Sequence, residues 1–188
     1  MTENLREQLR EIYESLRSEV RERWDRDLPL EELLFDRWER ARSLGFGEGA
    51  SIYHNSYVYG DVKVGRNTWI GPFTLLDGSG GLTIGEGCSI SSGVQIYSHD
   101  TVRWAVSAGI DAPEHSAVAI GDFTYIGSQT VVGRGVTIGE RAVIGACSFV
   151  NRDIPPHTVA VGVPCRPIGT VRIGEDGAAE LQYAAARP

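Results

Sequence analysis

Histidines with acidic neighbours are the residues of this sequence that could move protons at neutral pH. His99 is followed by Asp100, and His115 is preceded by Glu114. A histidine titrates near neutrality and can take a proton from a weak nucleophile such as an alcohol, which contributes roughly 10²- to 10⁴-fold in rate. We predict that His99 is the general base of a catalytic site, with His115 as the second candidate. The alternative is an exposed loop histidine that only caps the repeat described below.

Other side chains near His99 could assist it. Asp100 or Glu114 could orient the ring, but adjacent residues of an extended chain point apart, so Asp100 is better suited to fold the loop or bind substrate. Tyr97 and Trp104 could stack on a ring of the substrate or pack against a neighbouring subunit. No histidine or cysteine pair has the spacing that a preformed metal site favours, so we expect no metal.

These residues interrupt a repeat that must position them. An Ile, Leu or Val stands at every sixth residue from Ile52 to Leu82, the register slips by two residues to Ile84, and the count runs on to Ile96. It resumes at Ile120 and continues to Val150. A short fixed period is typical of a solenoid, in which each repeat buries its apolar side against its neighbours.

The other positions of the repeat indicate short strands and sharp corners. The residue two places before most of the aliphatic positions is small or β-branched, and it should point inward from the same strand. The residue after the aliphatic position is often glycine, where we expect a corner with positive φ. Three such sides per coil would make an all-β solenoid of triangular section.

The repeat is absent for 23 residues between Ile96 and Ile120, yet the coil regains its phase afterwards. We therefore predict one long loop, at about residues 98–117, inserted between coils at one corner. Long loops on rigid scaffolds are where function usually lies. His99 opens this loop, and Asp100 places a charge where the repeat calls for a core residue.

The remaining chain divides into a helical start and a short tail. Residues 3–26 carry apolar side chains at steps of three or four, and a second such pattern runs from Leu30 to Ala41. We expect residues 1–49 to form a two-helix N-terminal cap that cannot fold alone and must dock on something. Residues 50–169 would be the solenoid, and 170–188 a C-terminal tail with one strand followed by loose chain.

Composition limits the partners. The chain has 188 residues and a net charge of −7, which argues against general binding to nucleic acid or to a membrane surface. It has no apolar run of the roughly 18 residues that a membrane span needs, and its N-terminus is charged where a signal peptide would be apolar. We expect a cytoplasmic protein whose three cysteines are reduced.

The repeat and its ending resemble a known family. The segment YIGSQTVVGRGVTIGERAVIGACSFVNRDIPPHTVAVGVPCRPIG, which ends at Gly169, is similar to the closing coils of galactoside and maltose O-acetyltransferases. The resemblance to hexapeptide-repeat acyltransferases covers about residues 50–170. It implies a left-handed parallel β-helix, a homotrimer, and transfer of an acyl group, most simply acetyl, from an acyl-CoA co-substrate. The acceptor would be a hydroxyl or amino group of a sugar or nucleotide-linked sugar, with His99 as the base.

The same resemblance assigns residues to the acyl-CoA groove, which in the relatives runs between two subunits. Ser128 and Ala146 would contact the pantetheine arm, with Gly127 beside Ser128, and Tyr125 takes the place of a tryptophan next to the cofactor. The basic and polar residues expected near the phosphates are Asn151, Arg152 and Arg166. Gly169 stands where the relatives have a further basic residue, which puts one phosphate contact in doubt.

Asp77, in the segment FTLLDGSGG, falls close to an acidic residue that binds the acceptor in the sugar acetyltransferases. An Asp before Gly is also a common turn, so both interpretations stay open. Two other functions stay open as well. One is a zinc enzyme similar to the γ-type carbonic anhydrases, and the other is a non-catalytic trimeric β-helix scaffold.

Overall fold

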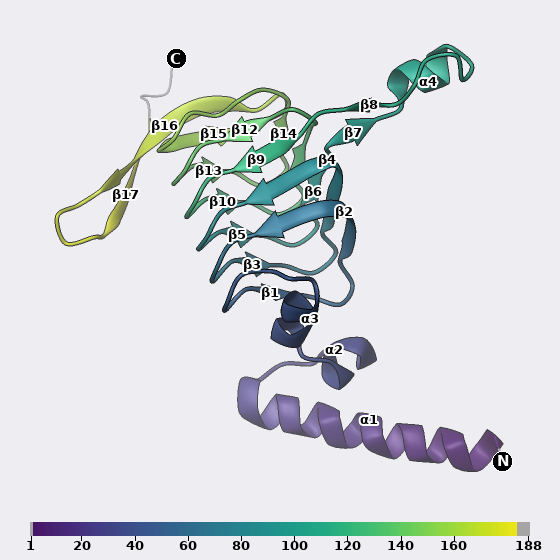
Figure 1. Cartoon of the computed structure of the whole chain (residues 1–188). Helices are drawn as coiled ribbons and strands as arrows, with labels where there is room; N and C mark the ends of the chain where they lie inside the picture. Colours follow the sequence, from purple (N-terminus) through teal and green to yellow (C-terminus); the bar gives the residue numbers. More distant parts are fainter. Residues whose placement is uncertain (1, 184–188) are drawn as a thin grey trace.

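Short parallel strands joined by tight corners wind through most of the chain (Figure 1). The structure, a computed structural model, describes residues 2–183. The strands before the long loop are β1 (Ser51–Ile52), β2 (Tyr57–Val64), β3 (Trp69–Ile70), β4 (Leu75–Ile84), β5 (Ser89–Ile90) and β6 (Gln95–Ile96). Those after it are β9 (Val118–Ile120), β10 (Tyr125–Ile126), β11 (Val131–Val132), β12 (Thr137–Ile138), β13 (Val143–Ile144), β14 (Phe149–Val150) and β15 (Thr158–Val161).

Strand register sorts the coils into three faces. Face 1 is the ladder β1-β3-β5-β10-β13-β15. Face 2 joins the first residues of β2 and β4 to β6, β11 and β14. Face 3 joins the last residues of β2 and β4 to β9 and β12. The predicted three-sided solenoid is therefore confirmed, and it is a left-handed parallel β-helix.

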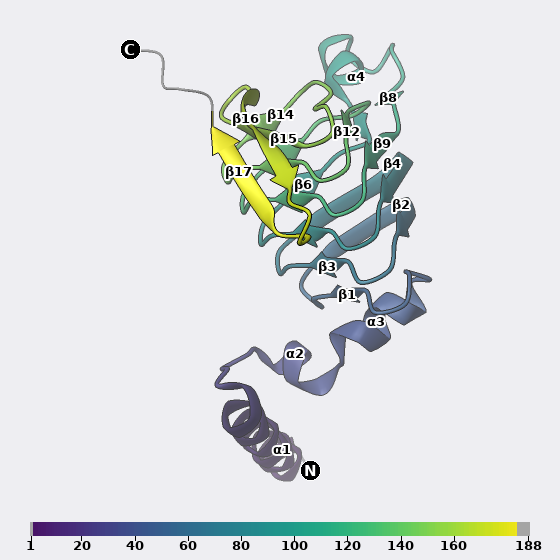
Figure 2. The same ribbon diagram turned by 90° about the vertical axis from the view of Figure 1, so that its left-hand side faces the viewer.

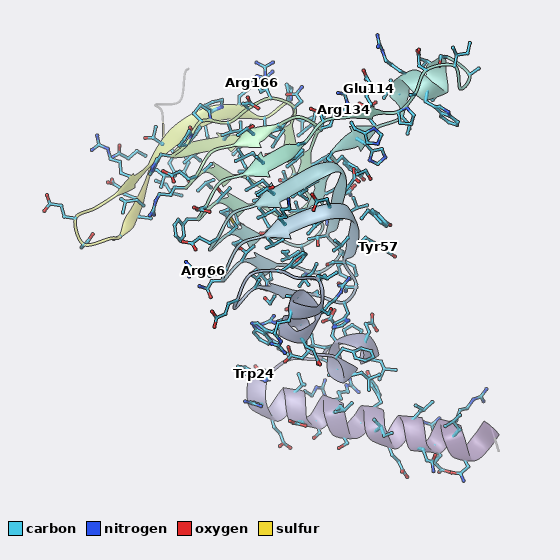
Figure 3. All side chains as sticks on the ribbon, viewed as in Figure 1. Trp24, Tyr57, Arg66, Glu114, Arg134 and Arg166 are labelled. Atoms are coloured by element: carbon cyan, nitrogen blue, oxygen red, sulfur yellow. The ribbon has the colours of Figure 1, made fainter. Side chains whose placement is uncertain are left out.

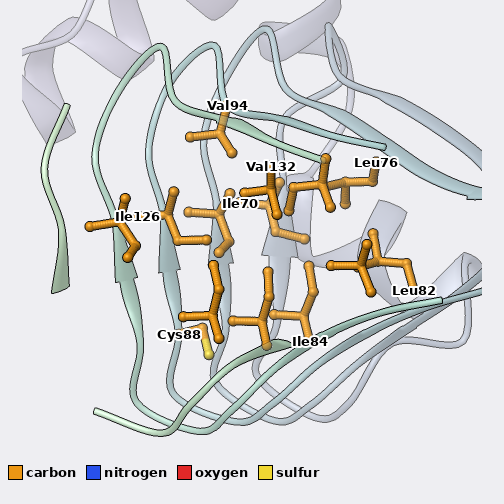
Figure 4. Packing of buried hydrophobic residues seen from close by; sticks show 14 of the residues in the cluster. Ile70, Leu76, Leu82, Ile84, Cys88, Val94, Ile126 and Val132 are labelled. Atoms are coloured by element: carbon orange, nitrogen blue, oxygen red, sulfur yellow. The ribbon is translucent and has the colours of Figure 1, made fainter. Parts of the chain in front are cut away.

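The aliphatic ladder forms the core (Figure 4). Fourteen of its fifteen members are buried, and the fifteenth, Val58, packs against the others. Burying one such side chain stabilises the fold by about 1.5–3 kcal/mol. Thr68, Thr124 and Thr130 also point inward, where each hydroxyl donates to a glycine carbonyl of the next coil. These three hydroxyls are thereby hydrogen-bonded, whereas the buried hydroxyl of Thr74 has no hydrogen-bond partner among residues 2–183.

The corner glycines do not have the conformation that we expected. Positive φ falls two residues later, for example at Phe73 (59°) and Gln129 (61°). At several corners, such as that of Gly127, the glycine is required because neighbouring coils come close. A Cβ on Gly127 would lie 2.5 Å from the backbone nitrogen of Ala146. The prediction of positive φ at these glycines was wrong, and close backbone contact is the physical reason for several of them.

The two-residue slip in the repeat has a structural counterpart in β4. In the pairing of β2 with β4, Gly60 faces Gly78 and Val62 faces Leu82. One residue of β2 is therefore matched by three residues of β4, and the extra two lie at the corner between faces 2 and 3. We call this corner 2–3, and it consists of residues 60–61, 78–81, 133–135 and 151–153. The coils above the insertion keep their register.

The N-terminal part contains three helices where two were expected: α1 (Thr2–Trp24), α2 (Leu30–Leu34) and α3 (Arg37–Ser43). Asp36 breaks the second predicted helix, because its carboxylate accepts from the backbone N–H groups of Trp38 (2.7 Å) and Glu39 (2.9 Å) and so caps α3.

α3 docks on the coil, and α2 contacts it through Glu32, whose carboxylate accepts from the backbone N–H of His54 at 2.5 Å. Arg40 donates to the backbone oxygens of Tyr53 and Ser56, and Ala41 is buried. In contrast, α1 lies away from the coil (Figures 1 and 2), and Leu5, Leu9 and Ile12 are 49–57% exposed. α1 instead contacts α2.

The C-terminal tail is more ordered than expected. β16 (Arg166–Ile173) and β17 (Ala179–Tyr183) form an antiparallel hairpin that extends face 1 (Figure 2). The expected single strand is therefore two, and residues 184–188 lie outside the described part. Within residues 2–183, no helix is both long enough and apolar enough to cross a membrane.

The long loop leaves the coil at corner 2–3 and carries its own small elements. β7 (His99–Asp100) pairs antiparallel with β8 (Glu114–His115), and α4 (Val102–Val106) lies between them. Figure 1 shows α4 projecting beyond the coils. We refer to β7 and β8 as the neck of the loop.

Candidate active site

His99 and Asp77 form a hydrogen-bonded pair at corner 2–3. The neck places the His99 ring beside β4, where Nδ1 lies 2.5 Å from Oδ2 of Asp77. The His99 side chain is 34% exposed, whereas that of Asp77 is 1% exposed. The carboxylate thus lies behind a ring that solvent can reach.

Four donors hold the Asp77 carboxylate. Oδ1 accepts from the backbone N–H (2.9 Å) and the hydroxyl (2.5 Å) of Ser79, and Oδ2 accepts from the backbone N–H of Ser98 (3.0 Å) and from His99. Burial alone would raise the pKa of Asp77, but these hydrogen bonds outweigh it and lower the pKa to about 2. An ionised carboxylate only accepts, so Nδ1 of His99 carries a hydrogen. Nε2 is then the nitrogen with a free lone pair.

The bonds of Asp77 agree with the turn interpretation and go beyond it. The turn interpretation accounts for its bonds to Ser79, but not for those to Ser98 and His99. Acceptor binding is not the role that the geometry supports, because the carboxylate is buried and its oxygens are already bonded. Its position suits it to orient the His99 ring and to stabilise positive charge on it.

Asp100 and Glu114, the residues suggested to orient His99, bind Arg134 instead. Nε of Arg134 donates to Oδ2 of Asp100, and Nη2 donates to Oε2 of Glu114 at 2.6 Å. Oδ1 of Asp100 accepts from the backbone N–H of Val102. Asp100 thus helps to fold the loop, which is one of its two predicted roles. The side chains of His99 and Asp100 are adjacent in the sequence but bind different residues, Asp77 and Arg134.

His115 lies directly across the neck from His99. The two are register partners, and their rings stack with centroids 5.8 Å apart and an interplanar angle of 23°. The second histidine candidate is therefore close to the first. His99 is the one that Asp77 orients.

Backbone contacts fix the neck to the coils on either side. The hydroxyl of Ser98 accepts from the backbone N–H of Gly80 (2.7 Å), and the carbonyl of Ser98 accepts from Ser116 (2.8 Å). The carbonyl of Ser116 accepts from Gly135 in the next coil (3.1 Å). The insertion in β4 thus provides the surface on which the neck rests.

Four residues predicted to bind the acyl donor meet at one corner, between faces 1 and 2. Tyr125 is 43% exposed on β10 and leads into Gly127 and Ser128. Ala146 is exposed at the same corner of the next coil, where Cys147 donates to the carbonyl of Ser128. Ser128 and Ala146 thus give this corner small side chains on two consecutive coils.

The other residues predicted to bind the acyl donor lie elsewhere. Asn151 and Arg152 are exposed at corner 2–3, after β14, and Arg166 is exposed at the start of β16 (Figure 3). Face 2 separates the Ser128 corner from corner 2–3. The residues predicted to bind the acyl donor thus lie on both sides of face 2 and do not form one cluster.

The two aromatic residues predicted to bind the acyl acceptor also lie in different parts of the structure. The hydroxyl of Tyr97 donates to Gln95 at 2.6 Å, and the half-buried ring lies on the His99 coil. Trp104 is on α4, in the projecting part of the loop, and is 51% exposed. The structure therefore brings Tyr97, but not Trp104, to the coil that carries His99.

Sequence reasoning missed two features near the site. Tyr57 and Tyr59 are 61% and 49% exposed, their rings stack at 6.2 Å, and Tyr59 is the register partner of Asp77. Two tyrosines at a spacing of two residues on one strand were the available signal, since both must point outward. The bridging position of Arg134 had no signal in the sequence.

In the range 2–183, no group of three His, Cys, Asp or Glu side chains is arranged to hold a metal ion.

Comparison with known proteins agrees with the repeat and the fold. Residues 117–152 match the bacterial transferase hexapeptide (six repeats) family. Galactoside O-acetyltransferase of Escherichia coli is 33% identical over 127 residues, which are 57% of this chain and 63% of that enzyme. The chain thus spans less than two thirds of the length of this curated relative.

Two solved structures share more of the chain. A hexapeptide-repeat-containing acetyltransferase of Vibrio cholerae, complexed with acetyl coenzyme A, is 28% identical with a TM-score of 0.59 and 87% coverage of both chains. A galactoside acetyltransferase in complex with coenzyme A is 28% identical with a TM-score of 0.58, over 86% of this chain and 82% of that one. The resemblance of this chain to the hexapeptide-repeat acyltransferases is confirmed in both sequence and fold.

Proposed function

We propose that the protein is an acyl-CoA-dependent acyltransferase that transfers an acetyl group to a hydroxyl or amino group of a sugar or nucleotide-linked sugar. The observation that carries the proposal is the pair formed by Asp77 and His99 on a β-helix similar to coenzyme A-binding acetyltransferases. The exposed ring and its buried carboxylate are the arrangement that a general base requires.

The proposed mechanism uses Nε2 of His99. Bound acyl-CoA would supply an acyl group activated as a thioester. Nε2 takes the proton of the acceptor hydroxyl as the acceptor oxygen bonds to the thioester carbon. The hydrogen bond from Nδ1–H to the Asp77 carboxylate stabilises the imidazolium that forms. When the carbon–sulfur bond breaks, His99 returns the proton to the departing sulfur, so the products are acylated acceptor and free thiol. An amino acceptor would need less help, because a neutral amine attacks unaided.

Face 2 is the wall that we propose for the donor. It lies between the small residues Ser128 and Ala146 at one corner and His99 at the other, and Phe149 on this face is 38% exposed. A long thin thioester could reach from one corner to the other. Arg166, which is exposed at the start of β16, would meet its phosphates, whereas Arg152 lies at the same corner as His99 and so at the thioester end of this path.

The acceptor would lie below the neck. Tyr59 is beside Asp77 in the sheet, and its exposed ring offers an aromatic surface against which a sugar can pack. We further propose a homotrimer in which a neighbouring subunit supplies the second wall of the donor groove. A stable and active monomer in sedimentation would refute that arrangement.

The test is a free-thiol assay with acetyl-CoA and longer acyl-CoAs against free sugars, nucleotide sugars and amino sugars. We expect thiol release that depends on one acceptor class and falls at least a hundredfold in His99→Ala. A matched control is His157→Asn, because His157 is a partly exposed histidine with φ of 56°, a conformation that Asn tolerates. Thiol release from no acyl-CoA would overturn the proposed activity, and a His99→Ala rate within a few fold of wild type would remove His99 as the base.

A further inference from the structure

Arg134 connects three segments that are far apart in the sequence. It follows β11 at corner 2–3, and its guanidinium uses different nitrogens for Asp100 of β7 and for Glu114 of β8. Figure 3 shows Arg134 and Glu114 near each other where the loop leaves the coil. One side chain therefore ties both strands of the neck to the coil.

We infer that Arg134 is a positioning residue that fixes His99 by holding the two strands of the neck together against the coil. The inference rests on the proposed function, in which His99 is the base. Arg134 acts through the neck, since its partners are the residues adjacent to His99 and His115.

The neck needs such a clamp for two physical reasons. β7 and β8 are two residues long each, and a pair of strands so short has little stability of its own. In addition, Asp100 and Glu114 are direct cross-strand partners, and like charges in that position repel. A planar guanidinium can bond to both carboxylates at once, which a single ammonium does less well.

The charges of the clamp are consistent with this role. Hydrogen bonding to Arg134 lowers the pKa of Asp100, and hydrogen bonding to Asp100 raises the pKa of Arg134. The three side chains are 33–35% exposed, so the clamp is partly screened by salt.

A different role for Arg134 would be to bind phosphate of the donor. Two of its nitrogens already serve the neck carboxylates, which favours positioning. The two roles predict opposite kinetics. Loss of a phosphate contact raises KM for acyl-CoA, whereas loss of positioning lowers kcat.

The experiment compares Arg134→Met, Arg134→Lys and wild type in the thiol assay. For Arg134→Met we expect kcat to fall about 10- to 100-fold with KM for acyl-CoA within about twofold, since a small misplacement of a reacting group has effects of this size. Arg134→Lys should recover part of the loss. The matched control is Arg66→Met, which removes another arginine that bonds to a Glu of the next coil, at 2.9 Å, but lies far from the neck.

Two double variants test whether Arg134 acts as stated. In the His99→Ala background, Arg134→Met should give no further loss, because the group that it positions is absent. In the Asp100→Asn/Glu114→Gln background, Arg134→Met should cost less than about threefold, because the repulsion is gone. Full additivity with His99→Ala, or a raised KM with unchanged kcat, would overturn the inference.

Hydrogen exchange provides a readout that does not depend on activity. In Arg134→Met, amides of residues 97–116 should exchange faster while those of the core strands stay unchanged. Unaltered exchange in the neck would contradict the clamp even if the enzyme is active. Absence of thiol release in the wild-type protein would instead refute the proposed function, and the exchange experiment would still decide whether Arg134 holds the neck.

Discussion

The Asp77→Asn variant tests the core of the proposed mechanism with almost no change in volume. Asp77 accepts bonds on both oxygens, from Ser79 on one side and from Ser98 and His99 on the other. Asparagine offers one oxygen, so its NH₂ group must face either the N–H of Ser79 or the N–H of Ser98. The charge that stabilises an imidazolium at His99 is lost in both orientations.

The magnitude follows from the type of bond. A hydrogen bond to a charged group contributes about 1.5–3 kcal/mol, and about 1.4 kcal/mol is a factor of ten in rate. We therefore expect kcat to fall about 10- to 100-fold in Asp77→Asn, with less effect on KM for acyl-CoA, because the Asp77 side chain is 1% exposed and is bonded to the His99 ring that covers it.

The assay is steady-state thiol release at saturating acceptor, with circular dichroism to check the fold. Asp153→Asn is the matched control, because Asp153 accepts from the backbone N–H of Thr137 at 2.7 Å on the same corner of the coil without touching a histidine. A kcat for Asp77→Asn within twofold of the control would refute the claim that the carboxylate assists His99.

Three further predictions concern stability and the neck. The lowered pKa of Asp77, about 2 against 3.8, stabilises the fold above pH 4 and is lost as pH falls through 2, so the wild-type advantage over Asp77→Asn in unfolding free energy should shrink by about 2 kcal/mol between pH 5 and pH 2 in urea titrations. Gly80→Ala would place a Cβ 2.4 Å from the carbonyl oxygen of Ser98, so we expect about 1–3 kcal/mol of destabilisation and a lower kcat. Gly133→Ala, whose Cβ has its nearest contact at 3.6 Å, should be tolerated, and equal effects of the two would contradict the packing argument. Ile126→Ala removes a fully buried side chain and should cost about 2–5 kcal/mol in the same titrations, and a cost below about 1 kcal/mol would mean that the coil relaxes around the cavity.

The solenoid could be predicted because its information is local and periodic. Each ladder residue from Ile52 to Val150 packs on residues of the same type one coil away, so a fixed spacing in sequence becomes a fixed position in space. The conformation of the corners was harder to predict. Glycine is compatible both with positive φ and with close packing, and the sequence does not distinguish these two reasons.

The site could be predicted only in part. His99 was identified because it begins a break in the repeat, and the local sequence suggested Asp100 or Glu114 as its partner. The partner in the structure is Asp77, 22 residues earlier, because coils bring residues of different turns together. Asp100 and Glu114 instead form hydrogen bonds with Arg134. This pairing depends on the path of the neck and does not show in the periodicity of the sequence.

The segments outside the coil show the same limit. The cap of Asp36 on α3 split a predicted helix, although Asp36 and Glu39 are spaced as at a helix start. The second strand of the C-terminal hairpin was missed because its pairing with β16 is antiparallel and lies outside the repeat.

The insertion at residues 78–81 has a consequence for how this scaffold can change over time. A solenoid tolerates added residues at a corner, because every later coil still stacks in its original register. Here the added residues bind the neck that carries His99, through the bond from Gly80 to Ser98. The part of the loop around α4 projects away from this contact (Figure 1). The sequence around α4 and the sequence at residues 78–81 can therefore change independently. New acceptor contacts could be selected in α4 without disturbing the hydrogen bonds that aim His99.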